Sequence, residues 1–564
     1  MLLIRFSERR VILTAVVFCT SCVAYFYLLD HFLFSSSGFS PIFIFLLSTF
    51  DRQTGWLSLG VCLIAVVWNR PAPVLRLVNF FGNHPVAIAL GCSVVLGFGN
   101  ILLYHNYPLS MDEYAAVFQS KIFASGRVID HLPPGLLDWL VVRGFDGTFL
   151  MTSSKTGGVV ATYWPGFALL LSPFQYLNVP WLCNASLSGL AIILIYYITH
   201  QLTKDALAAG WAMLFALASS AFVAEGIAYY SMQAHLAANL LFVALLIKPS
   251  GRRALGAGLV GSLALILHNP LPHMLFAAPW IIAIAAAPTE RRYLLPLLAG
   301  YVPGIAICII WLMLRSEFRL GYHGITAVSR VVSEAFRWPD SILINMRVAA
   351  LVKMSVWAAP CLFACALWGA MRSRVYACVS RLAWSAILTF FGYLFVGFDQ
   401  GHGWGYRYIH SAWGVVPILA AFAIANDLRA SPRITSFAGA TAVLSLLIIV
   451  PFQMRQIEQF VSQHLAQLPS PKRPGNNIYF IHPTGGFYVA DMVQFDPLLR
   501  DRDLLLISHG GELDEKLVRE NWPNAVKLSS GQAADQWYLG PNDERVPIPD
   551  SSGQRQFVIA KIPH

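Results

Sequence analysis

Two adjacent carboxylates, Asp112 and Glu113, follow an apolar stretch at 84–104 in a chain where only 12% of residues are Asp, Glu, Lys or Arg. Charged side chains beside a membrane are costly, so their presence calls for a reason. One reason is chemistry, because a positioned carboxylate can act as a general base that takes a proton from a hydroxyl group. The pair is equally consistent with residues that open a loop or cap a helix over 114–123, since acids are favoured in the first turn of a helix.

A second group lies in the polar segment 399–410, which has three glycines in five positions. Glycines let a backbone approach a ligand closely, and Arg407 supplies a planar fork of donors that matches a phosphate or a carboxylate. Trp404 and Tyr406 offer flat faces that suit sugar rings, and His402 adds a further polar group. The structural alternative is a glycine-rich hairpin whose aromatic residues lie in the interfacial belt of a membrane. A belt accounts for the aromatic residues but not for Arg407.

Two lysines and an aromatic pair are weaker candidates. Lys155 and the pair Tyr163-Trp164 lie late in the loop that Asp112 opens, so the lysine could contact an anion and the rings a sugar or an acceptor. Lys353 lies six residues inside a predicted span, where a lysine must face a cavity or extend toward the interface. We therefore include Lys353 among the candidate phosphate contacts.

Histidines and cysteines show no metal-binding pattern. His235 and His268 lie at predicted helix ends and are candidate sugar or acceptor contacts, although a histidine at such a place is more often structural. His268 and His273 flank a turn, so they lack the helical spacing of a metal pair. All nine cysteines fall in or beside apolar segments. We expect no cofactor; a divalent metal would be compatible with the carboxylates but is not indicated.

The elements that must position these residues are membrane helices. The chain has 564 residues, 57% of them hydrophobic, and apolar runs near the length of a bilayer crossing recur from residue 11 to residue 453. This composition predicts an all-α polytopic membrane protein with about thirteen transmembrane helices. The predicted spans are 11–31, 55–69, 84–104, 183–200, 206–228, 230–248, 254–269, 271–288, 294–313, 347–369, 383–398, 411–426 and 434–453.

Basic residues predict the orientation of these spans. If the N-terminus is cytoplasmic and the spans alternate, sixteen bases and only four acids fall in the cytoplasmic segments, and the C-terminus lies outside. The formal charge of +10 is then mainly an orientation signal and predicts no nucleic-acid partner. The bases are Arg5, Arg9, Arg10, Arg70, Arg76, Lys204, Lys248, Arg252, Arg253, Arg291, Arg292, Arg372, Arg374, Arg381, Arg429 and Arg433, and the acids are Glu8, Asp205, Glu290 and Asp427.

The irregular parts of the chain then lie on the outer side, in loops at 105–182, 314–346 and 399–410 and in a tail after 453. Within the first loop, a helix at the membrane interface is expected over 115–124 and a re-entrant or surface-lying helix over 165–178; 41–50 has the same pattern. Short β-type runs at 478–481, 504–507 and 557–559 predict a small α/β domain. The expected domains are 1–83, additional N-terminal helices; 84–453, a catalytic membrane domain; and 454–564, a C-terminal domain that serves as a lid or scaffold.

This order of parts resembles the GT-C superfamily of membrane glycosyltransferases. The similarity is strongest in Met111–Arg127, which begins Met-Asp-Glu-Tyr-Ala-Ala, and extends over about 84–453 with the glycine-rich Tyr406-Arg407-Tyr408 loop near its end. It is closest to the bacterial branch with aminoarabinose, galacturonic acid and arabinofuranose transferases and the protein O-mannosyltransferases. Two departures from these relatives are His268-Asn269-Pro270, where an Arg-Pro pair is expected, and Tyr163–Gly166, where the aminoarabinose branch has Lys-Pro-Pro.

The resemblance implies a donor sugar carried on a polyprenyl phosphate and used on the outer face of the bacterial inner membrane. Asp112 would be the general base, with Glu113 beside it, and Arg407, Lys155 and Lys353 would contact the donor phosphate. One base without an enzymic nucleophile gives inversion at the sugar carbon. The acceptor would be a lipid, a glycan or a protein. A flippase or transporter of lipid-linked glycans, and a polymerase or ligase of the O-antigen type, are the alternatives.

Overall fold

Two compact units make up the protein. The computed structural model describes residues 2–32, 40–316, 318, 336–372, 376–397, 399–428, 431–470 and 474–541. A helical unit comprises Met1–Asn106, Trp181–Ile310 and Ile325–Ile457. An α/β unit comprises Tyr107–Pro180, Trp311–Gly324 and Glu458–His564. Each unit is thus assembled from segments that lie far apart in the sequence.

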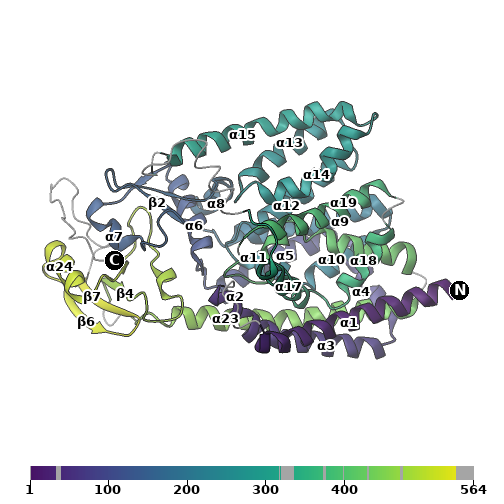
Figure 1. Cartoon of the computed structure of the whole chain (residues 1–564), viewed down its shortest axis with the longest axis horizontal. Helices are drawn as coiled ribbons and strands as arrows, with labels where there is room; N and C mark the ends of the chain where they lie inside the picture. The colour runs from purple at the N-terminus through teal and green to yellow at the C-terminus, as the bar shows by residue number, and fades with distance from the viewer. Residues whose placement is uncertain are drawn as a thin grey trace. The chain divides into compact units, whose positions relative to one another are not determined.

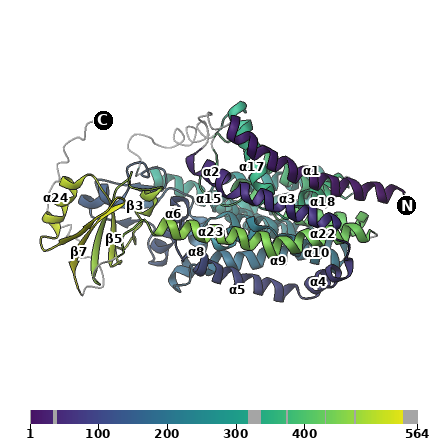
Figure 2. The same cartoon turned by 90° about the horizontal axis from the view of Figure 1, so that it is seen from below.

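The helical unit is a bundle of apolar helices (Figure 1). Within it, α1 packs against α3 and α5 packs against α9, with their axes running in similar directions (Figure 2). Its helices are α1 (Leu2–Phe32), α2 (Pro41–Leu46), α3 (Arg52–Val67), α4 (Pro71–Asn83), α5 (Pro85–Leu103), α9 (Leu182–Thr203), α10 (Ala206–Leu217), α11 (Ser220–Ile227), α12 (Met232–Leu246), α13 (Gly251–Ile266), α14 (Leu271–Ala286), α15 (Leu294–Ser316), α17 (Ser341–Val356), α18 (Leu362–Arg372), α19 (Ala377–Gly392), α20 (Arg407–His410), α21 (Val415–Ala423), α22 (Pro432–Leu444) and α23 (Val450–Leu465). The last residues of α15, from Trp311, and of α23, from Glu458, belong to the α/β unit.

Among the described residues, six helices are long and apolar enough to cross a membrane, or up to eight if each of two bent pairs is one span. Four shorter apolar helices accompany them. Each of the thirteen ranges predicted from the sequence contains helix. The prediction of a polytopic helical membrane protein is confirmed, whereas the number of thirteen crossings stays a prediction.

Two predicted spans are broken. The range 206–228 consists of α10 and α11, which are bent by 65°. The range 347–369 consists of α17 and α18, which are separated at 357–361. Pro360 explains the second break, because proline disfavours the helical conformation of the residue before it and cannot donate to the preceding turn.

The segment 41–50 is helical. It forms α2 and a π-helical turn at Leu47–Asp51, which leads directly into α3. After α3 the chain bends by 115° into α4, a helix that we did not predict. Pro71 begins α4 at a position where proline is favoured in helices.

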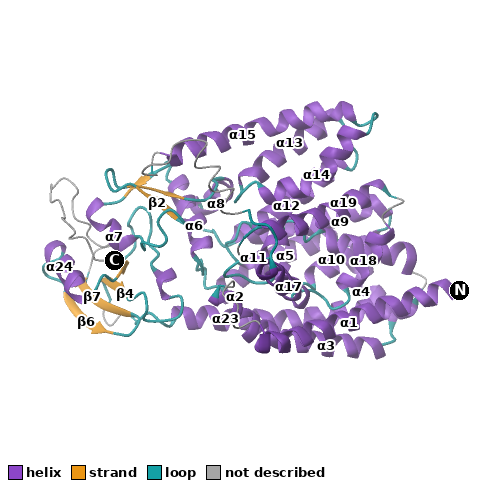
Figure 3. Ribbon diagram, viewed as in Figure 1, coloured by secondary structure: helices purple, strands orange, loops and turns teal. Residues whose placement is uncertain are grey.

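The strands among the described residues are all in the α/β unit (Figure 3). The tail forms a four-stranded sheet in the order β5-β4-β7-β6, with β4 and β5 parallel and the other pairs antiparallel. The first loop forms a three-stranded antiparallel sheet, β1-β3-β2, that we did not predict. The strands are β1 (Asp130–His131), β2 (Leu150–Thr152), β3 (Gly158–Ala161), β4 (Asn476–Ile481), β5 (Asp503–Ile507), β6 (Val526–Ser530) and β7 (Ala534–Gly540), and the helices of this unit are α6 (Met111–Ala124), α7 (Leu137–Leu140), α8 (Gly166–Tyr176) and α24 (Gly511–Asn521).

The α/β character of the tail is confirmed. Its predicted runs at 478–481 and 504–507 are strands β4 and β5, while the run at 557–559 lies outside the described residues. The 165–178 segment contains α8, as expected, and 115–124 belongs to α6. Most of the predicted loop 314–346 also lies outside the described residues.

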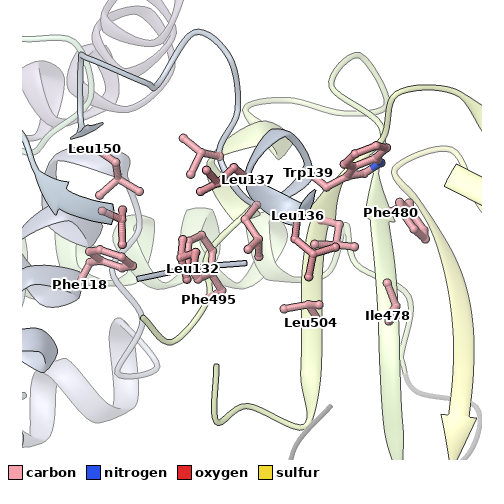
Figure 4. Close-up of a cluster of buried hydrophobic side chains, with 14 of the residues drawn as sticks. Phe118, Leu132, Leu136, Leu137, Trp139, Leu150, Ile478, Phe480, Phe495 and Leu504 are labelled. Carbon is pink, nitrogen blue, oxygen red and sulfur yellow. The ribbon is translucent and has the colours of Figure 1, made fainter. Parts of the chain in front are cut away.

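One hydrophobic core joins the first loop to the tail (Figure 4). Phe118 and Trp139 from the loop pack in the same cluster as Phe480 and Leu504 from the tail sheet. Full burial of a large apolar side chain contributes about 1.5–3 kcal/mol. Because both segments contribute to this cluster, the tail is an integral part of the structure that positions the residues of the first loop.

Candidate active site

Helix α6 begins with a capping box that uses Glu113. Ser110 is the N-cap residue, and the Glu113 carboxylate accepts hydrogen bonds from the backbone N–H groups of Leu109, at 3.0 Å, and Ser110, at 3.2 Å. Glu113 is fully buried. Reciprocal bonds of this kind satisfy the N–H groups that have no partner inside a helix. The capping alternative considered from the sequence therefore describes the contacts of Glu113.

Asp112 has a different environment, although it is the next residue. Its side chain is only partly buried, and it accepts a hydrogen bond from the Tyr163 hydroxyl group. The backbone carbonyl of Tyr163 in turn accepts a bond from Trp311 Nε1 at 2.9 Å. The carboxylate of Asp112 is thus oriented by a tyrosine whose own position is fixed. An oriented and accessible carboxylate suits a group that must meet a substrate hydroxyl.

A third carboxyl group, Asp491, lies beside this helix N-terminus. Its Oδ2 accepts the Met111 N–H at 3.4 Å, and Gln494 Nε2 donates to the Pro108 carbonyl at 2.8 Å. Burial raises the pKa of Asp491 to about 7, the Met111 bond opposes that shift, and the negative charge of Asp112 adds to it. Asp491 could not be identified as a neighbour of α6 from local sequence patterns, because 380 positions separate it from Met111.

The second set of candidates surrounds Arg407 in the helical unit. The guanidinium group lies over the Tyr230 ring, 4.2 Å from its centroid, and donates through Nη2 to the Gln400 carbonyl. The backbone N–H of Arg407 donates to Gln400 Oε1 at 2.7 Å. The Tyr230 hydroxyl is 2.9 Å from His402 Nδ1. Arg407 is therefore held by its own loop and by Tyr230, which lies between α11 and α12.

The glycines of this loop are required by its geometry. Gly401, Gly403 and Gly405 have φ values of 62°, 136° and 61°, which side chains rarely allow. A Cβ atom on Gly403 would lie 2.5 Å from Arg407 Nε. The absence of a side chain at this position therefore makes room for the guanidinium group.

Trp404 and Tyr406 are packed into the protein. Trp404 is 2% exposed and donates from Nε1 to the Tyr104 hydroxyl at 2.7 Å, and its ring lies 6.1 Å from that of Trp357. Tyr406 is 4% exposed. In this arrangement the two rings shape the loop, and their contact with a sugar stays a prediction.

Both broken helices lie against this loop. The Ala221 N–H, in α11 just after the first break, donates to the Trp357 carbonyl at the second break, at 3.1 Å. The position of a Cβ atom on Gly405 is 3.0 Å from Ala221 and 3.7 Å from Trp357. Interrupted helices at membrane depth are tolerated where they are buried in protein or line a cavity. The two breaks and the glycine-rich loop thus form one non-helical layer beside Arg407.

Lys353 is neutralised by an acid that we did not consider from the sequence. Its Nζ lies 2.6 Å from Asp51 Oδ2, and Trp357 Nε1 donates to Asp51 Oδ1, also at 2.6 Å. Both members of the ion pair are fully buried. A lysine in such a pair has little net charge to offer a phosphate, which weakens the case for Lys353 as a donor contact. That contact stays a prediction.

The remaining candidates are dispersed. Lys155 is exposed in the turn between β2 and β3. Trp164 packs against the cluster that contains Trp311. His235 is fully buried in α12, whereas His268, after α13, is only partly buried.

The structure thus groups the predicted residues within each unit. Asp112, Glu113 and Tyr163 meet at the start of α6, and His402 and Arg407 meet through Tyr230. Sequence reasoning missed Asp491, Gln400 and Asp51. The capping box was readable from Ser110 and Glu113, which have the Ser-x-x-Glu spacing.

Comparison with known proteins gives a structural match only. No protein-family model and no curated protein matches the sequence. The fold is similar to the crystal structure of ArnT from Cupriavidus metallidurans bound to undecaprenyl phosphate, with a TM-score of 0.50 and 12% identity over 82% of this chain and 99% of that chain. For ArnT in the apo state the TM-score is 0.47, with 12% identity over 80% and 97%. The match therefore shows an ArnT-like fold, in agreement with the fold class expected from the sequence.

Proposed function

We propose that the protein is an inverting glycosyltransferase that moves a sugar from a polyprenyl-phosphate donor to a lipid, glycan or protein acceptor. The observation that carries this proposal is the partly buried Asp112, oriented by Tyr163 at the start of α6. The shared fold with ArnT, whose crystal structure contains undecaprenyl phosphate, supports the donor class. A lipid-borne donor also agrees with the absence of a P-loop motif from the sequence. The GxGxxG match at Gly256–Gly261 lies inside helix α13 and not between a strand and a helix, as a dinucleotide-binding motif would.

In the proposed reaction Asp112 takes the proton from an acceptor hydroxyl group as its oxygen attacks the anomeric carbon. The new bond joins that oxygen to the sugar carbon, and the bond from the sugar to the phosphate oxygen breaks. The electron pair leaves with the polyprenyl phosphate. Attack from the face opposite the leaving group inverts the sugar carbon. Tyr163 keeps the Asp112 carboxylate oriented while its charge changes.

Arg407 is the proposed contact of the departing phosphate. Its guanidinium group is fixed by Gln400 and Tyr230, so little conformational freedom is lost when it binds an anion. A preorganised cation stabilises the negative charge that develops on a leaving group. Lys353 is neutralised by Asp51, which favours Arg407 over Lys353 for this role.

Mass spectrometry of lipids, glycans and proteins from cells with and without the gene tests the activity. We expect one class of molecule to lose the mass of a single sugar residue when the gene is deleted. That difference would identify the sugar and the acceptor together. Loss of a complete glycan from the cell surface would instead favour a flippase, and no change in any class would contradict the proposal.

We further propose that the α/β unit and the chemistry lie on the outer face of the inner membrane, as the sixteen bases predict. In a background without the nine native cysteines, Glu512→Cys in α24 should react with a membrane-impermeant thiol reagent added to intact spheroplasts. Arg252→Cys in α13, also an exposed residue, should react only after the membrane is opened. The opposite labelling pattern would place Asp112 in the cytosol and contradict the proposal.

A further inference from the structure

Asp491 reaches the proposed base from a distant part of the chain. It lies in a short turn, Val489–Met492, and its Oδ2 accepts the Met111 N–H of the first helical residue of α6. The next residue of α6 is Asp112. The turn is held by Gln494, which bonds to the Pro108 carbonyl, and by two bonds between the Tyr114 hydroxyl and the backbone of Phe495, at 2.7 and 2.9 Å.

The surroundings of Asp491 are acidic and apolar. Burial is the largest cause of the raised pKa of Asp491, and repulsion by Asp112 adds to it. Burial likewise raises the pKa of Tyr107, and the charges of Asp491 and Glu113 add to that shift. The Tyr107 hydroxyl is buried and has no hydrogen-bond partner among the described residues, and its ring lies against His464 at 6.3 Å. Among the residues that the structure describes, Asp491 forms no ion pair with a lysine or an arginine.

The neighbouring Asp496 shows the contrasting arrangement. It belongs to the same segment but forms ion pairs with Lys121, at 3.5 Å, and with Arg500, at 3.0 Å. Asp496 also accepts the Leu498 N–H at 2.8 Å. These contacts explain Asp496 as a structural carboxylate. Asp491 caps the Met111 N–H of α6 but, unlike Asp496, forms no ion pair among the described residues that would offset the charge of the neighbouring Asp112.

We infer that Asp491 is a positioning residue for the proposed transfer, acting through Asp112 as the second member of a carboxyl pair. This inference rests on the proposed function. Two neighbouring carboxyl groups do not both ionise readily, so the pair retains one proton to a higher pH than a single acid does. When Asp491 loses its proton, the added negative charge increases the proton affinity of Asp112, which makes Asp112 a stronger base.

The pH dependence of transfer tests this role. The rate of the wild-type protein should rise with an inflection near pH 7, where Asp491 loses its proton. Asp491→Asn keeps an oxygen that can accept the Met111 N–H, but it should remove that inflection. Asp496→Asn, the matched control, removes ion pairs in the same segment and should leave the inflection in place.

Stability provides a readout that does not depend on activity. A carboxyl group whose pKa rises from 3.8 to about 7 on folding makes the folded state less stable as pH increases through that interval. Asp491→Asn should therefore unfold at a higher temperature than the wild type above pH 7, and the difference should shrink toward pH 4. A carboxylic-acid band in infrared difference spectra should also titrate near pH 7 in the wild type and be absent in Asp491→Asn.

The outcomes separate the two proposals. If the wild type transfers sugar but Asp491→Asn keeps the inflection, or if no carboxyl band titrates near pH 7, the inference about Asp491 is wrong and the proposed function stands. If the band titrates as expected but no sugar is transferred to any acceptor, the proposed function is wrong, and the role of Asp491 in transfer is wrong with it.

Discussion

Replacing Asp112 by Asn should reduce the turnover of sugar transfer by about 10²–10⁴-fold, the usual contribution of a positioned general base. The amide keeps the size of the side chain and can still accept the Tyr163 bond, but it cannot take a proton from the acceptor. The measurement is the rate of transfer by purified protein, with the donor and acceptor that mass spectrometry identifies. Binding of the donor should change little, because the proposed phosphate contact is elsewhere.

Two matched variants show whether the loss of turnover in Asp112→Asn comes from the loss of the base. Tyr163→Phe removes only the hydrogen bond that orients Asp112, so its loss of turnover should be smaller than that of Asp112→Asn. Glu113→Gln removes charge from the capping box and should lower the free energy of unfolding by about 0.5–2 kcal/mol, with part of the turnover retained. Normal turnover by Asp112→Asn together with an inactive Glu113→Gln would assign the base to Glu113. Activity in both variants would contradict a carboxylate base in this segment.

The helices were predictable because apolar length alone specifies them, but the breaks were not. A run of apolar residues at 206–228 gives no sign that the chain leaves the helix at Ala218 and Ser219. Pro360 was a visible signal for the break between α17 and α18. Helix α4 was missed because it has only 13 residues and contains Arg76, so it resembles a polar connection.

The α/β unit was only partly predictable because the first loop and the tail, which share its core, depend on each other. The β-type runs of the tail predicted β4 and β5 correctly. The strands of the first loop have only two to four residues each, too short for a periodic pattern. Their stability comes from a core that includes tail residues such as Phe480 and Leu504. A contact between segments so far apart leaves no local pattern in one sequence.

The same limit applies to the site. The position of Asp112 at the start of a helix and the glycines around Arg407 could be inferred locally, and the structure agrees with both. The residues that set the charge around these candidates could not be inferred locally. Asp51 neutralises Lys353 across 302 positions of sequence, and Asp491 reaches the N-terminus of α6 across 380.

The buried pair of Lys353 and Asp51 gives a second large expected effect. Lys353→Met leaves the Asp51 carboxylate buried without its cation, and removing one partner of a buried pair typically lowers the free energy of unfolding by about 3–5 kcal/mol. Adding Asp51→Asn removes the uncompensated charge and keeps an acceptor for Trp357 Nε1. The double variant should therefore recover most of the lost stability, as measured by unfolding of the purified protein in detergent.

The stable double variant also discriminates between the two candidate phosphate contacts. If Lys353 serves to neutralise Asp51, the double variant should bind undecaprenyl phosphate as the wild type does. Arg407→Lys should weaken that binding by about tenfold or more, because a lysine keeps the charge but loses the planar fork, and a charge-assisted hydrogen bond contributes about 1.5–3 kcal/mol. Weak binding by the double variant together with unchanged binding by Arg407→Lys would exchange the roles of the two cations. Equal stability of Lys353→Met and the wild type would mean that the ion pair does not neutralise a buried charge, which contradicts the arrangement around Asp51.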